Sequence, residues 1–420
     1  MPCTPLFSRT PFKNEQTFFN VFENGKMHFE TKKNFRRIVF VLATLTLVSW
    51  YIYLTSHELS EFVLKNEVPA RSPELLLVPT DNEPTTRPER VPSAFENSLK
   101  EGIKGCFVYF VNDANWVNAR RAIREIEDRF NNRHYYPWVI LSSVELMPEF
   151  EEYVGAMTTA DITFAQIPHT AWLFPQGINL TRAYAPDSFT FRGGDLANVE
   201  LSSRFLARYL SGPVFDHPIL APYSYAWLVS STSSYPCDIT LDPFLYMHRH
   251  NMSYSFVIPF RERLGEEEPT HPSLWDTSLQ FIDTHPQYRI PQNQSLVNFI
   301  TQGSKHGGWN LCHFLPGAIE VLDLRFYKSP AYQEFFIAID EAGGFFYAGW
   351  GPEHVRSIGS TLLLPRSAVK WWYEIGVREA GLAYCPSDLE TGKARADCIC
   401  RLEENFERSS KSCLAEFFDL

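Results

Sequence analysis

Two carboxylate-bearing stretches of this chain contain the residue types that sugar-phosphate chemistry requires. Asp238 and Asp242 are four residues apart, and on a loop at a strand end both could approach a divalent cation that bridges a diphosphate. A solvated turn is the simpler interpretation of that stretch. Glu320 precedes the apolar Leu322 and Leu324. A carboxylate in an apolar stretch is a candidate nucleophile or base, and a helix-capping or surface glutamate is the alternative.

Histidine and cysteine residues offer fewer candidates for metal binding or catalysis. His313 lies between Cys312 and Phe314, where a hydrogen-bonded core histidine is more common than a metal ligand. The pair Cys398 and Cys400 has a spacing one residue short of the usual zinc knuckle. The chain contains no Gly-rich phosphate loop of the P-loop or dinucleotide type. A phosphate-containing ligand would therefore have to be bound by groups other than a Gly-rich loop.

The elements that must position these side chains form an α/β pattern. Cys106–Val111 and Trp138–Leu141 are short apolar runs that predict buried strands. Between them, Val117–Phe130 has apolar residues at three- and four-residue spacing, which predicts an amphipathic helix. Strand, helix and strand in this order indicate a βαβ unit and a parallel sheet. We expect further helices over 201–210, 331–340 and 368–375, and a strand over 255–259.

The net charge of −11 is unevenly distributed over the 420 residues. Residues 1–37 carry seven Lys/Arg against three Glu, so the remainder of the chain is strongly acidic. Because phosphate backbones require a basic surface, we expect no nucleic-acid partner.

The basic end precedes an apolar run. Residues 38–54 contain no charge, Gly or Pro, and we expect a single transmembrane signal anchor there. A cleaved signal peptide and a buried core helix are the alternatives. The positive flank predicts that residues 1–37 form a cytoplasmic tail.

Residues 55–100 are rich in Pro and acidic residues and predict an extended stem. An ordered extension packed on the body is the alternative. We expect residues 101–420 to form one luminal domain.

Sequons and cysteines in the body indicate an oxidising compartment. Asn179, Asn251 and Asn293 begin glycosylation sequons. Seven of the eight cysteines follow the apolar run, so we expect structural disulfides, with one cysteine left over.

Several strings, in order, resemble the fungal α-1,2-mannosyltransferases of glycosyltransferase family 15, the glycolipid 2-α-mannosyltransferase type. The similarity covers about residues 104–413. The strings are Glu127-Asp-Arg-Phe-Asn131, Tyr136-Pro-Trp-Val139, Phe215-Asp-His-Pro218, Cys237-Asp-Ile, Leu241-Asp-Pro-Phe244, Asn310-Leu-Cys-His-Phe314, Glu320 to Leu324, Gly343-Gly-Phe-Phe-Tyr347, Trp350-Gly351 and Tyr384-Cys-Pro386.

The resemblance implies a GT-A-like α/β fold and transfer of mannose from GDP-mannose to mannose on glycoproteins or glycolipids, with retention and with Mn²⁺, in protein glycosylation and cell-wall mannan synthesis. It also implies a type II Golgi membrane protein that contacts other Golgi glycosyltransferases. The family's candidate nucleophile falls on Glu320, with one extra residue between Cys312 and Glu320. Donor or acceptor contacts are expected from Asp238, Asp242, His313, Trp350 and Arg356.

The departures from the family lie at its metal and donor positions. The metal-contacting glutamate of the family falls on Ser230, and its metal-binding histidine falls on Arg356. Asp238 and His354 are weaker candidates for a cation. The alternative function is therefore an impaired relative that binds glycans or organises transferases in the lumen.

Overall fold

The computed structural model describes residues 102–111, 116–184, 199–261, 272–304, 308–388 and 391–418. The expected tail, the anchor at 38–54 and the stem lie outside these residues. Among the described residues, no helix is long and apolar enough to cross a membrane.

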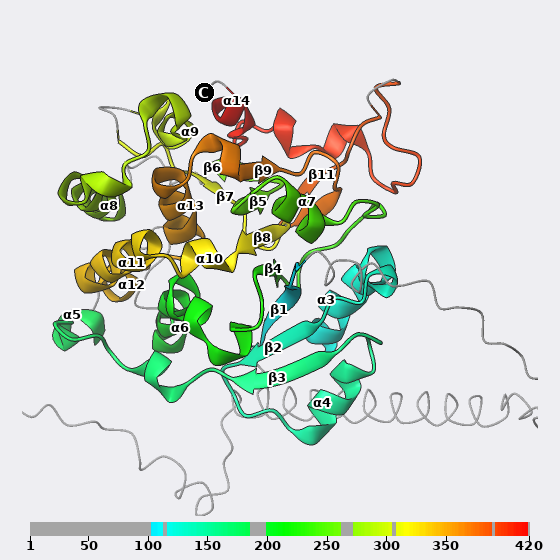
Figure 1. Ribbon diagram of the computed structural model, residues 1–420, viewed down its shortest axis with the longest axis horizontal. Helices are drawn as coiled ribbons and strands as arrows, with labels where there is room; N and C mark the ends of the chain where they lie inside the picture. The colour runs from blue at the N-terminus through cyan, green and yellow to red at the C-terminus, as the bar shows by residue number, and fades with distance from the viewer. Residues whose placement is uncertain are drawn as a thin grey trace, which may run out of the picture. The chain divides into compact units, whose positions relative to one another are not determined.

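A seven-stranded mixed sheet organises the described body (Figure 1). Its order is β3-β2-β1-β4-β8-β5-β9. The strands are β1 (Gly105–Val111), β2 (Trp138–Ser142), β3 (Ile162–Gln166), β4 (Tyr225–Val229), β5 (Tyr254–Phe256), β8 (Glu320–Asp323) and β9 (Val369–Trp371). Strands β1 to β4 run parallel to one another. Strand β8 is antiparallel to both β4 and β5, and β9 is parallel to β5.

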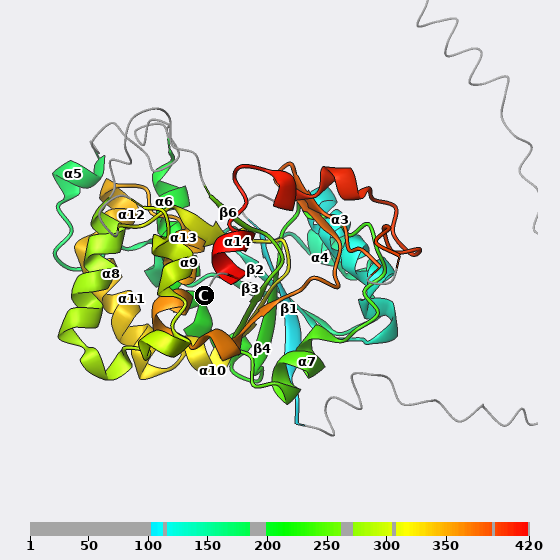
Figure 2. The ribbon, with the colours of Figure 1, turned by 90° about the horizontal axis from the view of Figure 1, so that it is seen from above.

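Helices cover both faces of the sheet (Figure 2). On one face, α3 (Trp116–Arg129) and α4 (Pro148–Gly155) bury Ile123 and Val154 in one core. On the other face, α6 (Leu201–Ser211), α11 (Pro330–Ala342) and α13 (Pro352–Leu363) contribute to a second core. Successive side chains of β1 alternate between the two cores, because strand side chains alternate between faces.

The remaining helices and strands complete the body. They are α5 (Leu180–Tyr184), α7 (Pro243–Arg249), α8 (Pro272–Thr284), α9 (Val297–Thr301), α10 (Leu324–Tyr327), α12 (Gly344–Tyr347), α14 (Leu414–Phe418), β6 (Pro259–Arg261), β7 (Cys312–Phe314), β10 (Val377–Glu379) and β11 (Leu382–Tyr384). Strands β6 and β7 pair with each other, as do β10 and β11.

The mixed α/β class and the first βαβ unit are confirmed, with β1, α3 and β2 beginning and ending within one residue of the predicted bounds. The predicted strand over 255–259 is two short strands, β5 and β6. The predicted helix over 368–375 is wrong, because Val369–Trp371 form β9. Its Val and Trp side chains favour an extended backbone, and pairing with β5 satisfies its backbone groups.

Three disulfides hold the body, as expected from its cysteines. They are Cys237–Cys398, Cys312–Cys413 and Cys385–Cys400. Cys106 is the free cysteine among the described residues and is buried in β1.

We predict that the Cys106 thiol is unreactive in the native protein. Burial raises the pKa of Cys106 far above that of an ordinary thiol, and its Sγ donates to the carbonyl of Tyr225 at 3.7 Å. The thiol therefore stays protonated and shielded at neutral pH. Maleimide should label Cys106 only after the protein is unfolded, with no reductant present so that the disulfides stay intact. Peptide mass mapping identifies the labelled cysteine. Equal labelling rates in the native and unfolded protein would contradict this prediction.

Candidate functional site

Glu320 is the first residue of β8 and lies opposite Leu228 of β4. Since side chains alternate along a strand, Glu320 shares a face with Leu322, which belongs to the core beneath α6 and α13. Only 2% of Glu320 is exposed. The helix-capping and surface interpretations of this glutamate are therefore wrong, and a buried carboxylate needs a partner.

That partner is Arg356 on α13, which is also buried. Its Nε and Nη2 donate to the two carboxylate oxygens of Glu320 at 2.8 and 2.9 Å. The third nitrogen, Nη1, donates to the carbonyl of Leu210 on α6 at 2.9 Å. Burial opposes the charge on Arg356, but the neighbouring carboxylate outweighs it and raises the pKa of the guanidinium. The guanidinium therefore stays charged and forms a bidentate pair with the Glu320 carboxylate.

Tyr254 on β5 completes the surroundings of Glu320. Its hydroxyl donates to Oε1 of Glu320 at 3.1 Å. Burial, and then the charge of Glu320, raise the pKa of Tyr254 well above its usual value, so this hydroxyl remains a donor. Three donors contact this buried carboxylate, so each oxygen of Glu320 has a hydrogen-bond partner in this arrangement.

The loop before Glu320 has an unusual backbone conformation. Two of its residues adopt left-handed backbone, Gly317 with φ 80° and Ile319 with φ 62°. A β-branched residue rarely adopts this conformation, so the surrounding packing must enforce it at Ile319. A Cβ on Gly317 would lie 2.4 Å from the Cβ of Ser230. The loop backbone therefore fills the space beside Ser230.

Ser230 follows β4 and turns its hydroxyl toward other oxygens. Its Oγ lies 2.8 Å from Oγ1 of Thr232 and 3.4 Å from Oε1 of Glu379. Glu379, at the end of β10, is 6% exposed. Sequence reasoning missed this carboxylate, because it comes from a segment far along the chain and no spacing connects it to Ser230.

The residues at the family's metal positions do not fit a divalent ion. Ser230 offers a hydroxyl in place of a carboxylate, and Arg356 offers a cation already paired with Glu320. The two weaker candidates have different surroundings. Asp238 pairs with Arg129 at 3.0 Å, whereas His354 is buried with its ring 4.6 Å from that of His313.

The other sequence candidates support the fold locally. Asp242 caps α7 by accepting from the backbone of Leu245 and also accepts from the hydroxyl of Tyr136. Trp350 is 2% exposed and packs over Gly344, where a Cβ would meet its ring. His313 is a buried histidine of β7, and its Nδ1 lies 3.1 Å from the carbonyl of Leu311. The structure thus brings Glu320 directly together with Arg356, and His313 with His354.

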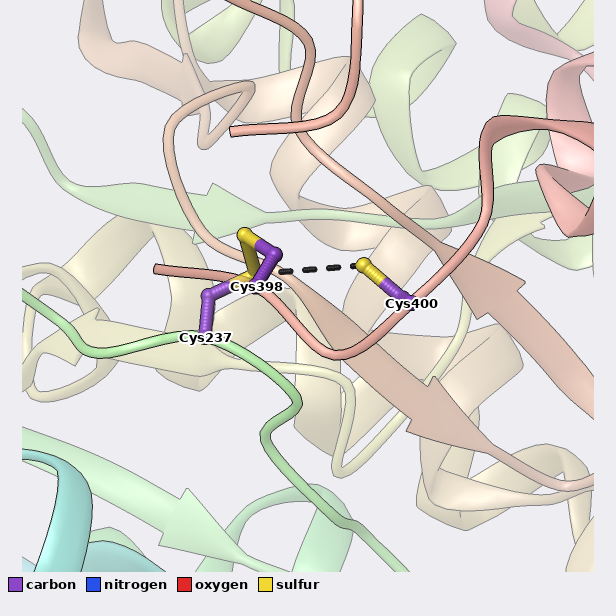
Figure 3. A group of neighbouring side chains, drawn as sticks. All are labelled: Cys237, Cys398 and Cys400. Atoms are coloured by element: carbon purple, nitrogen blue, oxygen red, sulfur yellow. Dashed lines mark hydrogen bonds between the residues drawn. A yellow bond between two sulfur atoms is a disulfide. The ribbon is translucent and has the colours of Figure 1, made fainter. Parts of the chain in front are cut away.

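The sulfur atoms of Cys237, Cys398 and Cys400 lie within 4.8 Å of one another, as in a metal cluster (Figure 3). Cys237 is bonded to Cys398, and Cys400 is bonded to Cys385. Because metals bind thiolates and these sulfurs are in disulfides, the group is structural in this state.

The parallel strands end together at one edge of the sheet, at Val111, Ser142, Gln166 and Val229. Open α/β sheets bind ligands at the carboxyl ends of their strands. A cleft of about 200 Å³ lies at this edge, with Ser142 and Gln166 among its lining residues.

Comparison with known proteins points to one family. The model of the family described as glycolipid 2-alpha-mannosyltransferase matches residues 72–420. Glycolipid 2-alpha-mannosyltransferase 1 of Candida albicans is 33% identical over 77% of this chain and 73% of its own length. O-glycoside alpha-1,2-mannosyltransferase homolog 2 of Schizosaccharomyces pombe is 33% identical over 76% of this chain and 82% of its own length.

Solved structures share the fold. The mannosyltransferase Ktr4p from S. cerevisiae in complex with GDP has a TM-score of 0.67, with 21% identity over 79% of this chain and 85% of its own. Core-mannan synthase A from Aspergillus fumigatus, in a Mn/GDP form, has a TM-score of 0.65, with 24% identity over 75% of this chain and 84% of its own.

We predict that Arg356→Met lowers the free energy of unfolding by about 3–5 kcal/mol, because it leaves the Glu320 charge buried without its partner. The double variant Glu320→Gln/Arg356→Met should lose less than the sum of the two single variants, since the two side chains interact directly. Urea unfolding followed by fluorescence provides the measurement.

The matched control is Arg124→Met, which breaks the exposed pair with Asp128 and should cost less than about 1 kcal/mol. An Arg356→Met loss as small as that of the control would mean that the buried pair does not stabilise the fold.

Proposed function

The chain belongs to the glycolipid 2-α-mannosyltransferase family, and we propose that it transfers mannose from GDP-mannose to a mannose hydroxyl of a glycoprotein or glycolipid, with retention of the α configuration. The observation that carries this proposal is the family match, which spans the whole described body. The shared fold supports a GT-A-like description of that body.

We place the donor at the edge of the sheet where β1 to β4 end. The support is the parallel arrangement of these strands and the cleft beside Ser142 and Gln166. The acidic and polar groups after β4 lie at the same edge, beginning with Ser230.

The proposed reaction uses neither a metal at the family positions nor a covalent intermediate on Glu320. Ser230 and Arg356 do not provide a ligand set, and both oxygens of Glu320 are occupied by donors. Retention then follows from attack on the face that the diphosphate leaves. The bond from C1 to the diphosphate oxygen breaks, the acceptor oxygen bonds to C1, and its proton passes to the departing phosphate.

In this proposal Glu320 and Arg356 act as positioning residues. Their pair fixes β8, next to β4, against α13 and α6. The end of β4 and the loop after it are thereby held at the donor edge.

We further propose that the body lies in the Golgi lumen on a single N-terminal anchor. Three disulfides in the body support an oxidising compartment. The three sequon asparagines Asn179, Asn251 and Asn293 are all exposed, so a glycosyltransferase can reach them.

We predict that the full chain converts GDP-mannose and methyl α-mannoside to an α-linked dimannoside, measured by mass spectrometry and by the anomeric NMR signal. Glu320→Gln should reduce the rate by about tenfold or less, whereas loss of a catalytic nucleophile costs roughly 10⁴-fold or more. Thermal melting must show that the variant is folded. Binding of GDP by a folded chain without any product would support the non-catalytic alternative instead.

For the location, we predict that endoglycosidase treatment of the expressed protein increases its mobility on a gel. A variant with Asn179, Asn251 and Asn293 replaced by Gln should run, without endoglycosidase treatment, at the mobility of the treated protein. An unchanged mobility, together with a protease-accessible body in sealed vesicles, would place the body in the cytoplasm.

A further inference from the structure

Two disulfides of the body lie side by side in space. The bridge Cys237–Cys398 joins the loop after β4 to a segment near the C-terminus, and the bridge Cys385–Cys400 lies within that segment. The Sγ atoms of Cys237 and Cys400 are 3.9 Å apart, although they belong to different bridges (Figure 3). We call these four residues the sulfur cluster. A thiolate released from one bridge therefore already lies against a sulfur of the other, which is the arrangement that thiol–disulfide exchange requires.

The two bridges differ in their access to solvent. Cys398 is partly exposed, and the neighbouring Ile399 is 74% exposed. Cys237 is fully buried, and Cys385 and Cys400 are 1% and 7% exposed. A thiol in solution can therefore reach the sulfur of Cys398, whereas the other three sulfurs of the cluster are shielded from it.

The charge beside Cys398 permits this approach. The carboxylate of Asp397 lies 4.0 Å from the Sγ of Cys398, and an unpaired negative charge there would repel an incoming thiolate. Arg395 offsets that charge, because its Nε and Nη2 donate to the two carboxylate oxygens of Asp397 at 2.7 and 2.6 Å. A small thiol that carries a positive charge meets the least repulsion at this position.

Cys237 would be confined after it is released from Cys398. A Cβ on Gly376 would lie 2.5 Å from the Sγ of Cys237, so the backbone of Gly376 closes one side of this sulfur. Because Cys237 has no exposed surface, a dissolved thiol cannot capture its thiolate directly. The sulfur of Cys400 is already in place, and such positioning favours an intramolecular reaction over one with a dissolved molecule.

We propose that Cys398 is a site of modification by a low-molecular-weight thiol, and that the sulfur cluster passes the exchange inward. The thiol attacks the Sγ of Cys398 and forms a mixed disulfide there, while the bond to Cys237 breaks. The Cys237 thiolate then attacks Cys400 and forms a Cys237–Cys400 bond, and Cys385 leaves and takes up the proton of the incoming thiol. One thiol is consumed and one is formed, so the exchange needs no oxidant or reductant.

In the product, the loop after β4 is still tethered to the segment near the C-terminus, now through Cys400. The modification does not depend on whether the chain transfers mannose. It requires only the contact between the two bridges and the exposure of Cys398.

The test uses the native full chain in detergent and cysteamine, a small thiol that carries a positive charge. After incubation at neutral pH, the protein is unfolded in acid with N-ethylmaleimide to stop the exchange, and its peptic peptides are mapped by mass spectrometry without reduction. We expect cysteamine on Cys398, a new Cys237–Cys400 peptide pair and maleimide on Cys385.

A variant tests the same contact without added thiol. Cys385→Ser leaves Cys400 as a free thiol beside the Cys237–Cys398 bond. The purified variant should therefore contain the Cys237–Cys400 pair as well as the native Cys237–Cys398 pair. Thermal melting shows whether the variant is folded, and the experiment on the native chain decides the question if it is not.

The third disulfide provides the controls. Cys312 and Cys413 are both 0% exposed, so cysteamine should leave their bridge intact in the native chain. Cys413→Ser, which leaves Cys312 as a free thiol, is the matched control variant and should keep the other two bridges in their native pairing.

Three results would overturn the proposal. The first is a native chain in which cysteamine does not modify Cys398. The second is cysteamine on Cys398 with maleimide on Cys237 and an intact Cys385–Cys400 bridge, because the exchange would then stop at the first step. The third is exclusively native Cys237–Cys398 pairing in a folded Cys385→Ser variant.

Discussion

The buried pair of Glu320 and Arg356 is the interaction on which the centre of the fold depends. Removing two charges from water costs several kcal/mol for each ion unless geometry and hydrogen bonds compensate. Here the compensation is bidentate and includes Tyr254 on β5 and the carbonyl of Leu210 on α6. One contact thus connects two strands of the sheet to two helices of the layer that covers it.

The first half of the sheet was predictable because its signals are local. Strands β1 and β2 are buried on both faces, so they read as continuous apolar runs, and α3 shows its buried stripe at helical spacing. Strand β9 was not predictable in this way. Its Trp and Val residues are interrupted by Lys370 at a spacing that also suits a helix, and only pairing with β5 decides between the two.

The resemblance named Glu320 and Arg356 as candidate site residues, but it did not predict their contact. A strand residue and a helix residue show no spacing that indicates a salt bridge. The sequence also gave no reason to place Glu379 beside Ser230. Contact between them depends on the bridge between Ser234 and Arg378, which brings β10 against the loop after β4. The backbone of Gly317 and the carboxylate of Glu379 both lie beside Ser230.

The order of strands in the sheet has a consequence for biosynthesis. Strand β4 pairs on one side with β8, and β5 pairs with β8 and β9, which are made much later. During elongation, β4 and β5 therefore present unpaired edges while about 65 to 115 further residues are added, and such edges template wrong pairings. Native sheet closure has to wait for β8 and β9, so the edges of β4 and β5 stay open to wrong pairing over that interval.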